Sequence, residues 1–224
     1  MLAIIKDENN KKYVSKVFAI KWKGWDSEVI VFNQDFTHIK ILDMWKPKRQ
    51  VFIVDYENFD CENDDWEGLD WIIHDKEFMK VLTNKKSVPV ENYLQLKEYA
   101  KEIKLPEWFE IKTQKDCDSL MEVSFGGFHD SQPVRAEQNG NNLELELDTT
   151  WGCHITLKFI DIIDMDIIER FGLIYESEMK IENDCIVWNV TGWQDGWIDS
   201  FTDEDNNNEP FVKCKKLLWK IDVD

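Results

Sequence analysis

The stretch NGNNLELELDTTWGCHITLKF, residues 139–159, predicts two antiparallel strands whose register can be written residue by residue. Asn139-Gly140 is a pair that two-residue type I′ hairpin turns favour, because both central positions of such a turn need positive φ. A turn at these two residues pairs Ala136 with Leu143, so that apolar side chains share one face. The hairpin therefore begins a sheet in the second half of the chain.

Alternation of apolar and polar residues assigns the two faces of these strands. The inward set is Leu143, Leu145, Leu147, Ile155, Leu157 and Phe159. With those side chains on one face, a short loop through Thr150-Trp151-Gly152 sets Lys158 beside Glu144 and His154 beside Asp148. These four polar side chains are then expected on the outer face.

A later hairpin and a final strand extend the same sheet. Asn183-Asp184 is expected as a turn that pairs Met179 with Trp188, which places Trp188 on the inner face. An alternating strand around residues 217–221 closes the chain. The second half is therefore predicted to be antiparallel β structure.

The first half reads as a group of strands followed by helices. Alternating or apolar runs of strand length occupy residues 14–22, 29–32, 39–42 and 51–54. The loops between them are too short for crossovers, so a four-stranded antiparallel meander is the simplest connection. Asp75 is a candidate cap for a short helix, and a second helix is expected from about Glu91 to Leu105. The predicted class is α+β, mainly antiparallel with a few covering helices, in two lobes at residues 1–115 and 116–224.

Composition indicates a folded chain that needs no disulfides. The 224 residues are 43% hydrophobic and 32% charged, enough to bury a core. Five cysteines lie far apart without a Cys-x-x-Cys pair, which predicts reduced thiols rather than a zinc site or a disulfide framework. No motif in the chain indicates a metal site or a cofactor, so neither is expected. The apolar run at residues 1–5 is too short for a signal segment, and no run approaches the ~20 residues of a membrane span. We therefore expect a cytoplasmic protein that does not bind membranes.

The charge lies almost entirely in the second half. Residues 116–224 carry 24 Asp and Glu against 8 Lys and Arg, a net of −16, whereas residues 1–115 carry 21 against 19. Such a field repels phosphate backbones and attracts basic proteins, so a basic protein partner is favoured and nucleic acid is not. The alternative is that the acids only keep an Ile-, Trp- and Phe-rich chain soluble. Neither reading predicts an oligomeric state.

The segment Phe128-His129-Asp130-Ser131, the Leu- and Glu-rich hairpin and the strand at residues 173–178 together resemble a known group. The resemblance, over about residues 125–190, is to uncharacterised bacterial proteins with a Phe-His-Asp-Ser/Ala start and a later Leu-Tyr-Glu-Glu strand. This chain departs from the pattern at Ile174 and Ser177. The group has no established activity, but it is similar in size and acidity to antagonists of bacterial toxins, which implies an immunity-like role.

The same segment also supports an enzymatic hypothesis. If it is extended, His129 and Ser131 share a face and Asp130 lies on the other, so a Ser131 nucleophile would need a further carboxylate and an oxyanion hole at Gly126-Gly127. A divalent-metal enzyme could instead recruit His129, Asp130, His154 and Glu144 or Glu146. The plainer interpretation is structural, with Asp130 or Ser131 bonded to nearby backbone.

Tryptophans beside acids mark a candidate partner surface. The predicted partner-binding set is Trp193, Asp195, Trp197, Asp199, Asp203, Glu204 and Asp205. Exposed aromatics rimmed by acids are typical of a hot spot for a basic protein, and they are also found in carbohydrate-binding modules. The leading hypothesis is a non-enzymatic bacterial protein-interaction module. A hydrolase or metal-dependent enzyme using His129, Asp130 and Ser131 is the alternative, and a carbohydrate-binding module is the second.

Overall fold

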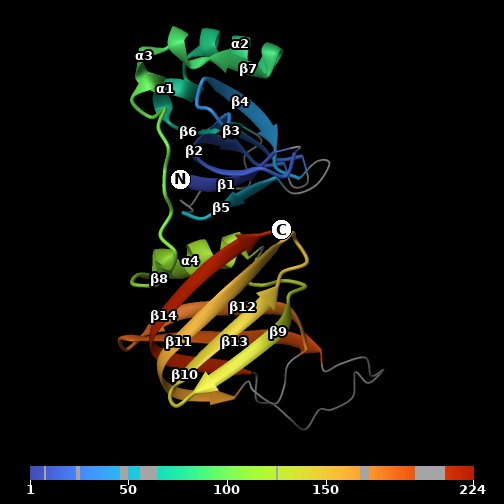
Figure 1. Ribbon diagram of the computed structural model, residues 1–224, viewed down its shortest axis with the longest axis vertical. Coiled ribbons are helices and arrows are strands. Elements are labelled where there is room, and N and C mark those ends of the chain that lie inside the picture. Colours follow the sequence, from blue (N-terminus) through green and yellow to red (C-terminus); the bar gives the residue numbers. More distant parts are fainter. Residues whose placement is uncertain are drawn as a thin grey trace. The chain divides into compact units, whose positions relative to one another are not determined.

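A computed structural model describes residues 1–7, 9–23, 26–45, 50–55, 65–124, 126–166, 172–194 and 210–224, with the backbone alone for residue 70 and residues 191–194. The chain divides into two compact units, Met1–Leu105 and Pro106–Asp224 (Figure 1). The observed division after Leu105 comes earlier than the predicted boundary at residue 115. The reason is that Phe109–Glu110 already pair with the last strand of the second unit. Both units are built on antiparallel sheets, which confirms the α+β class with two lobes.

The first unit holds one antiparallel sheet in the order β5-β1-β2-β3-β4-β7, with β6 also paired to β2. Its strands are β1 (Leu2–Lys6), β2 (Lys12–Lys21), β3 (Glu28–Phe32), β4 (His38–Asp43), β5 (Val51–Ile53), β6 (Glu67–Gly68) and β7 (Ser87–Pro89). The meander prediction holds for β2, β3 and β4 but is wrong for β5, which pairs with β1. The reason is that the apolar run at the amino terminus forms strand β1, and β5 pairs with the edge of β1 instead of the edge of β4.

Helices cover one face of this sheet (Figure 1). They are α1 (Asp70–Ile73), α2 (Lys76–Lys85), the 3-10 turn η1 (Val90–Asn92) and α3 (Leu94–Lys97). Asp75 caps α2 as predicted, accepting a hydrogen bond from the backbone N–H of Phe78 at 2.9 Å. The long helix expected from Glu91 is wrong, since Tyr93 is extended at φ −132° and separates η1 from the single turn of α3.

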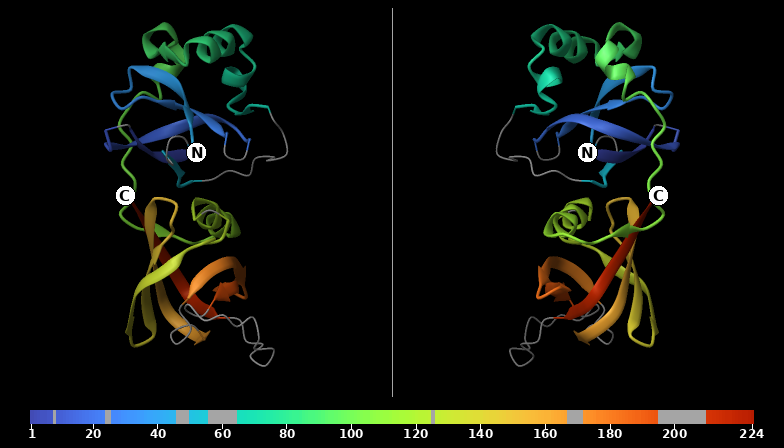
Figure 2. Two further views of the ribbon diagram at one scale, coloured as in Figure 1. Left: turned by 90° about the vertical axis from the view of Figure 1, so that its right-hand side faces the viewer. Right: turned by 90° about the vertical axis from the view of Figure 1, so that its left-hand side faces the viewer.

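The second unit, coloured from green to red in Figure 2, is built on an antiparallel sheet. The strand order is β12-β13-β14-β11-β10-β9, with β8 also paired to β14. Its elements are β8 (Phe109–Glu110), α4 (Gln114–Val123), β9 (Gln132–Asn139), β10 (Asn142–Asp148), β11 (Cys153–Asp166), β12 (Leu173–Glu182), β13 (Cys185–Gln194) and β14 (Phe211–Val223). No helix in the described residues is long and apolar enough to cross a membrane.

Most of the predicted register of this sheet is confirmed. Glu144 lies opposite Lys158, and Asp148 lies opposite His154. Met179 lies opposite Trp188. The β9–β10 hairpin is the exception, because Ala136 pairs with Leu145 and the turn is centred one residue later than predicted. That error moves Ala136 by two residues, so it still lies opposite an inward-facing leucine. The pairing with β9 then shifts register between Glu146 and Leu147, and Val134, which was predicted to face inward, is 54% exposed.

The core of the second unit lies on the predicted inner face. Trp188 and Phe159 are fully buried and stack with ring centroids 5.8 Å apart, while Phe128 meets Trp188 edge-on at 5.6 Å. Four free cysteines are buried: Cys117, Cys153, Cys185 and Cys214. Burial raises the pKa of Cys117 and of Cys214 to about 12, so both remain protonated thiols near neutral pH.

Candidate functional site: the Gly126–Ser131 turn on strand β12

The segment singled out from the sequence lies where the two edge strands of the second sheet meet. Ser131, just before β9, forms an isolated antiparallel bridge with Ile174 of β12. The Ile174 N–H donates to the Ser131 carbonyl at 2.9 Å. The Gly126–Ser131 turn therefore joins the first and last strands of the sheet order.

The segment is a compact turn, so the expectation that it could be extended is wrong. Gly126, Gly127, Phe128 and Asp130 all have positive φ, between 58° and 78°. The Gly127 N–H donates to the Met121 carbonyl at 3.0 Å, and the Phe128 N–H donates to Ser124 Oγ at 3.1 Å. These bonds tie the turn to the end of α4. The left-handed residues also bring the His129 and Asp130 side chains onto one side of the backbone, with Nε2 and Oδ2 3.6 Å apart.

Gly127 is the position in the turn that no other residue fits. A Cβ built on Gly127 would lie 2.3 Å from the Ser177 carbonyl oxygen of β12. At Gly126, by contrast, a Cβ would meet no atom within 4 Å. The first glycine therefore supplies only the left-handed backbone, whereas the second also allows the turn to contact β12.

Ser177 joins the turn to the core through its buried hydroxyl. Its Oγ donates to the Gly127 carbonyl at 2.6 Å and accepts from Trp188 Nε1 at 3.0 Å. The Gly127 carbonyl and the Trp188 indole N–H thereby each have a hydrogen-bond partner in the buried core. Both positions at which this chain departs from the Leu-Tyr-Glu-Glu pattern, Ile174 and Ser177, thus bond to the turn.

Strand β12 is irregular where the turn contacts it. Its pairing with β13 shifts register between Ile174 and Glu176, and again between Glu176 and Ser177. The Tyr175 carbonyl then meets His129 Nδ1. Because a carbonyl only accepts hydrogen bonds, Nδ1 carries the proton, and in the neutral imidazole Nε2 is an acceptor.

The other end of β12 is covered by a side chain of α4. Gln114 Nε2 donates to the Met179 carbonyl, and Gln114 Oε1 accepts from the Ile181 N–H, both at 3.0 Å. The amide group thereby makes the two bonds that a neighbouring strand would make. Together, Gln114 and the turn occupy the outer edge of β12, which would otherwise be open to pairing with another chain.

The predicted catalytic residues do not form a nucleophile and base. Ser131 is fully buried, and within the described part of the chain its Oγ has no hydrogen-bond partner. His129 directs Nδ1 to a carbonyl and Nε2 towards Asp130 instead. A general base would need to lie within hydrogen-bond reach of the hydroxyl it activates.

The residues suggested for a metal are also placed separately in the sheet. In β11, His154 Nδ1 lies 3.8 Å from Glu146 Oε1 and His154 Nε2 lies 3.4 Å from Asp224 Oδ1. The carboxylate beside His129 is that of Asp130. The residues that the structure describes contain no group of three or more His, Cys, Asp or Glu suited to hold a metal ion.

The predicted partner-binding set lies mostly outside the described residues. Asp195, Trp197, Asp199, Asp203, Glu204 and Asp205 all fall there. For Trp193 the backbone alone is described, and it pairs with Ile174 of β12. The set that was predicted therefore begins directly beside the Gly126–Ser131 turn.

Around the turn lie two aromatic groups that do not belong to the predicted partner-binding set. The Tyr175 side chain is 39% exposed, and Trp151 is half-buried with its Nε1 donating to the His129 carbonyl at 3.0 Å. Tyr175 belongs to the strand that carries the resemblance, which was the available signal. Nothing local in the sequence connects Trp151 or Gln114 to the turn.

No protein-family model matches the chain, and neither the curated proteins nor the solved structures contain a match.

Proposed function

We propose that the protein is a non-enzymatic interaction module whose acidic second unit binds a basic protein partner. The observation that carries the proposal is the charge excess of the folded second unit. Within the described residues of 116–224 there are 17 Asp and Glu against 7 Lys and Arg. The acidity is therefore not confined to residues 195–209, and a basic surface would meet a favourable field across the unit.

Most of the few basic side chains of this unit lie beside acids. At least four of the seven lie within ion-pair distance of a carboxylate: Arg135 with Glu137 at 2.7 Å, Lys158 with Glu144 at 3.5 Å, Lys180 with Glu178 at 2.7 Å, and Lys216 with Glu110 at 2.9 Å. The hydrogen bond from Lys180 holds the pKa of Glu178 below its ordinary value. The acids of the unit therefore outnumber those that its basic side chains can pair.

The geometry of the turn favours binding over hydrolysis as the proposed activity. Ser131 Oγ is buried, and in the described residues no base lies within hydrogen-bond distance of it. The Ser177 hydroxyl bonds both the Gly127 carbonyl and the Trp188 indole N–H. These are the features of a segment that maintains the fold. His129 and Asp130 remain at the surface, where they can contact a partner.

The finer parts of the proposal are a bacterial cytoplasmic location and an immunity-like role. Buried free thiols at Cys117, Cys153, Cys185 and Cys214 suit a reducing compartment. An acidic chain of 224 residues also has the size and charge expected of a protein that neutralises a basic toxin.

The test is affinity capture from bacterial lysate at low and high salt, comparing two charge-reversed variants. The variant Asp203→Lys, Glu204→Lys, Asp205→Lys changes the second unit, and Glu91→Lys, Glu98→Lys, Glu102→Lys makes the same charge change at exposed sites of the first. We expect one basic protein in stoichiometric amount, released by salt and lost only with the first variant.

Capture that survives high salt, or that both variants lose equally, would contradict a role for the acidic second unit. An empty lane at both salt concentrations would remove the interaction proposal altogether.

A further inference from the structure

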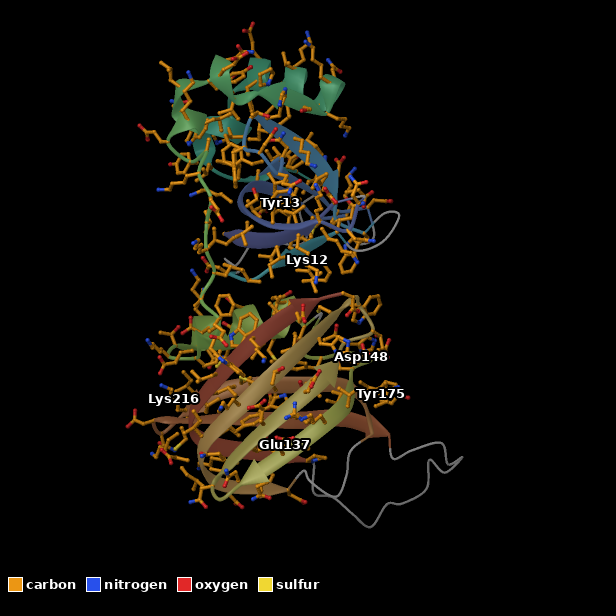
Figure 3. The ribbon with its side chains drawn as sticks, in the orientation of Figure 1. Lys12, Tyr13, Glu137, Asp148, Tyr175 and Lys216 are labelled. Carbon is orange, nitrogen blue, oxygen red and sulfur yellow. The ribbon has the colours of Figure 1, made fainter. Side chains whose placement is uncertain are left out.

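The exposed side of the Gly126–Ser131 turn forms a small surface of aromatic and acidic groups. It consists of His129, Asp130, Asp148, Trp151 and Tyr175, and we call it the seam surface. Asp148 pairs with Gln132, the residue after Ser131, and Ser131 bridges to Ile174, the residue before Tyr175. Figure 3 shows Asp148 and Tyr175 at the same end of the second unit.

We infer that the seam surface binds an arginine side chain of the basic partner. The inference rests on the proposed function and names the partner's contacting group. Its basis is the hydrogen-bonding character of the surface, its aromatic content and the rigidity of the turn beneath it.

Apart from the Tyr175 hydroxyl, which can donate or accept, the exposed side-chain polar groups of the seam surface are hydrogen-bond acceptors. Trp151 Nε1 and His129 Nδ1, the two ring donors, are both used by backbone carbonyls. That leaves the Asp130 carboxylate, 41% exposed, the second Asp148 oxygen and, in the neutral imidazole, His129 Nε2. A guanidinium carries five donors and no acceptor, so it complements such a surface, whereas a carboxylate or phosphate does not.

The aromatic groups favour arginine over lysine. Among the large apolar side chains that the described residues expose, Tyr175 is the aromatic one, and half-buried Trp151 donates its indole N–H to the His129 carbonyl. A planar guanidinium stacks on such rings while donating to a carboxylate in its own plane, which a compact ammonium cannot do. Tyrosine, tryptophan and arginine are also the residues that most often dominate binding energy at protein interfaces.

The seam surface is held in place before any partner arrives. Its backbone is fixed by the bond from Ser177 to Gly127, by the bridge from Ser131 to Ile174 and by Phe128 in the core. Binding therefore orders few additional groups, which lowers its entropic cost. Among the acids of the unit, Asp130 and Asp148 thus combine charge with a rigid aromatic setting.

The test uses an acetylated, amidated hexa-arginine peptide as the probe, followed by ¹⁵N NMR at low salt. We expect saturable shifts of the Trp151 indole N–H and of the Asp130 and Tyr175 amides. Asp130→Asn and Tyr175→Ala should each weaken binding about 10-fold, from loss of a charged hydrogen bond or of a cation–π contact. Asp184→Asn, an exposed acid at the far end of the β12–β13 hairpin, is the matched control and should change binding less than about 2-fold.

Tyr175→Phe keeps the ring and should retain binding, and a hexa-lysine peptide should bind at least several-fold more weakly. Shifts confined to other acidic residues, equal affinity for the lysine peptide, or the same shifts with neutral oligosaccharides would overturn the inference. So would unchanged affinity in both seam variants.

The two proposals fail in different ways. If Asp130→Asn and Tyr175→Ala retain the captured partner while Asp203→Lys, Glu204→Lys, Asp205→Lys loses it, the seam inference is wrong and the proposed function stands. If no partner is captured by the wild-type protein, the proposed function fails regardless of the peptide result.

Discussion

The β10–β11 ladder and the Gly126–Ser131 turn are neighbouring regions of one sheet that are stabilised in opposite ways. In the ladder, many equivalent residues alternate between core and solvent, as at Leu145 and Glu144. In the turn, single atoms decide the structure, above all the absent Cβ of Gly127 and the hydroxyl of Ser177. Substitutions on the outer face of the ladder should therefore be tolerated, while those on the buried side of the turn should not.

The largest effect is expected for Gly127→Ala. A Cβ 2.3 Å from the Ser177 carbonyl forces the turn away from β12, and positive φ adds backbone strain. We expect a loss of about 3 kcal/mol or more in the free energy of unfolding, measured by denaturant titration. Gly126→Ala is the control, since it has similar φ and open space, and should cost about 1–2 kcal/mol. Equal losses in the two variants would show that contact with β12 is unimportant.

The next effect is expected for Ser177→Ala. It leaves the Gly127 carbonyl and Trp188 Nε1 buried without their shared partner, at a cost of about 1–3 kcal/mol. A double-mutant cycle with Trp188→Phe measures how much of this passes through the indole. We expect a coupling of about 0.5 kcal/mol or more. Strictly additive losses would mean that Ser177 and Trp188 act independently.

A smaller effect is expected for Gln114→Ala, because its amide covers the outer edge of β12 in a more exposed setting. Loss of the two bonds to Met179 and Ile181 should cost about 1 kcal/mol and accelerate hydrogen exchange at the Ile181 amide. Gln114→Glu retains the acceptor for that amide but not the donor, so Ile181 should keep more protection. Unchanged exchange in Gln114→Ala would contradict a covering role.

The smallest effect is expected in the ladder, for Glu144→Gln. Its carboxylate lies 3.5 Å from Lys158, whose side chain is 40% exposed. Exposed pairs of this kind contribute little, so the free energy of unfolding should change by less than about 0.5 kcal/mol. A loss above about 1 kcal/mol in thermal or denaturant unfolding would remove the contrast between the ladder and the turn.

The ladder was predictable because its information is local and repeated. A period of two fixes the face of each side chain, and antiparallel pairing then leaves few registers that bury all the leucines. The one error, in the β9–β10 turn, occurs where this constraint is missing. Strand β9 is exposed along almost its whole length, so no buried set of side chains selects its partners.

The turn was not predictable because its partners are distant in sequence. Gly127 meets Ser177, and His129 meets the carbonyl of Tyr175, across 50 and 46 positions. The positive φ of Phe128 has no signal in a phenylalanine, which rarely adopts this conformation. Glycine and polar composition suggested a special segment but could not give its shape.

Similar reasons explain the differences in the first unit. The pairing of β5 with β1 joins residues far apart in sequence, whereas a meander uses only neighbouring strands. The apolar spacing after Glu91 resembled a helix, but Pro89 lies in β7 opposite His38. The chain therefore enters this region extended, and only one turn of α3 follows.

The central claim is that the second unit binds a basic protein through its acidic surface. The most direct test is the dissociation constant of the captured partner between about 50 and about 500 mM salt, for the wild-type protein, Ser131→Ala and Asp203→Lys, Glu204→Lys, Asp205→Lys. We predict that affinity falls steeply with salt in the wild-type protein and equally in Ser131→Ala, whereas the reversed variant binds weakly throughout. Affinity independent of salt, or lost in Ser131→Ala while its fold is intact, would contradict the claim.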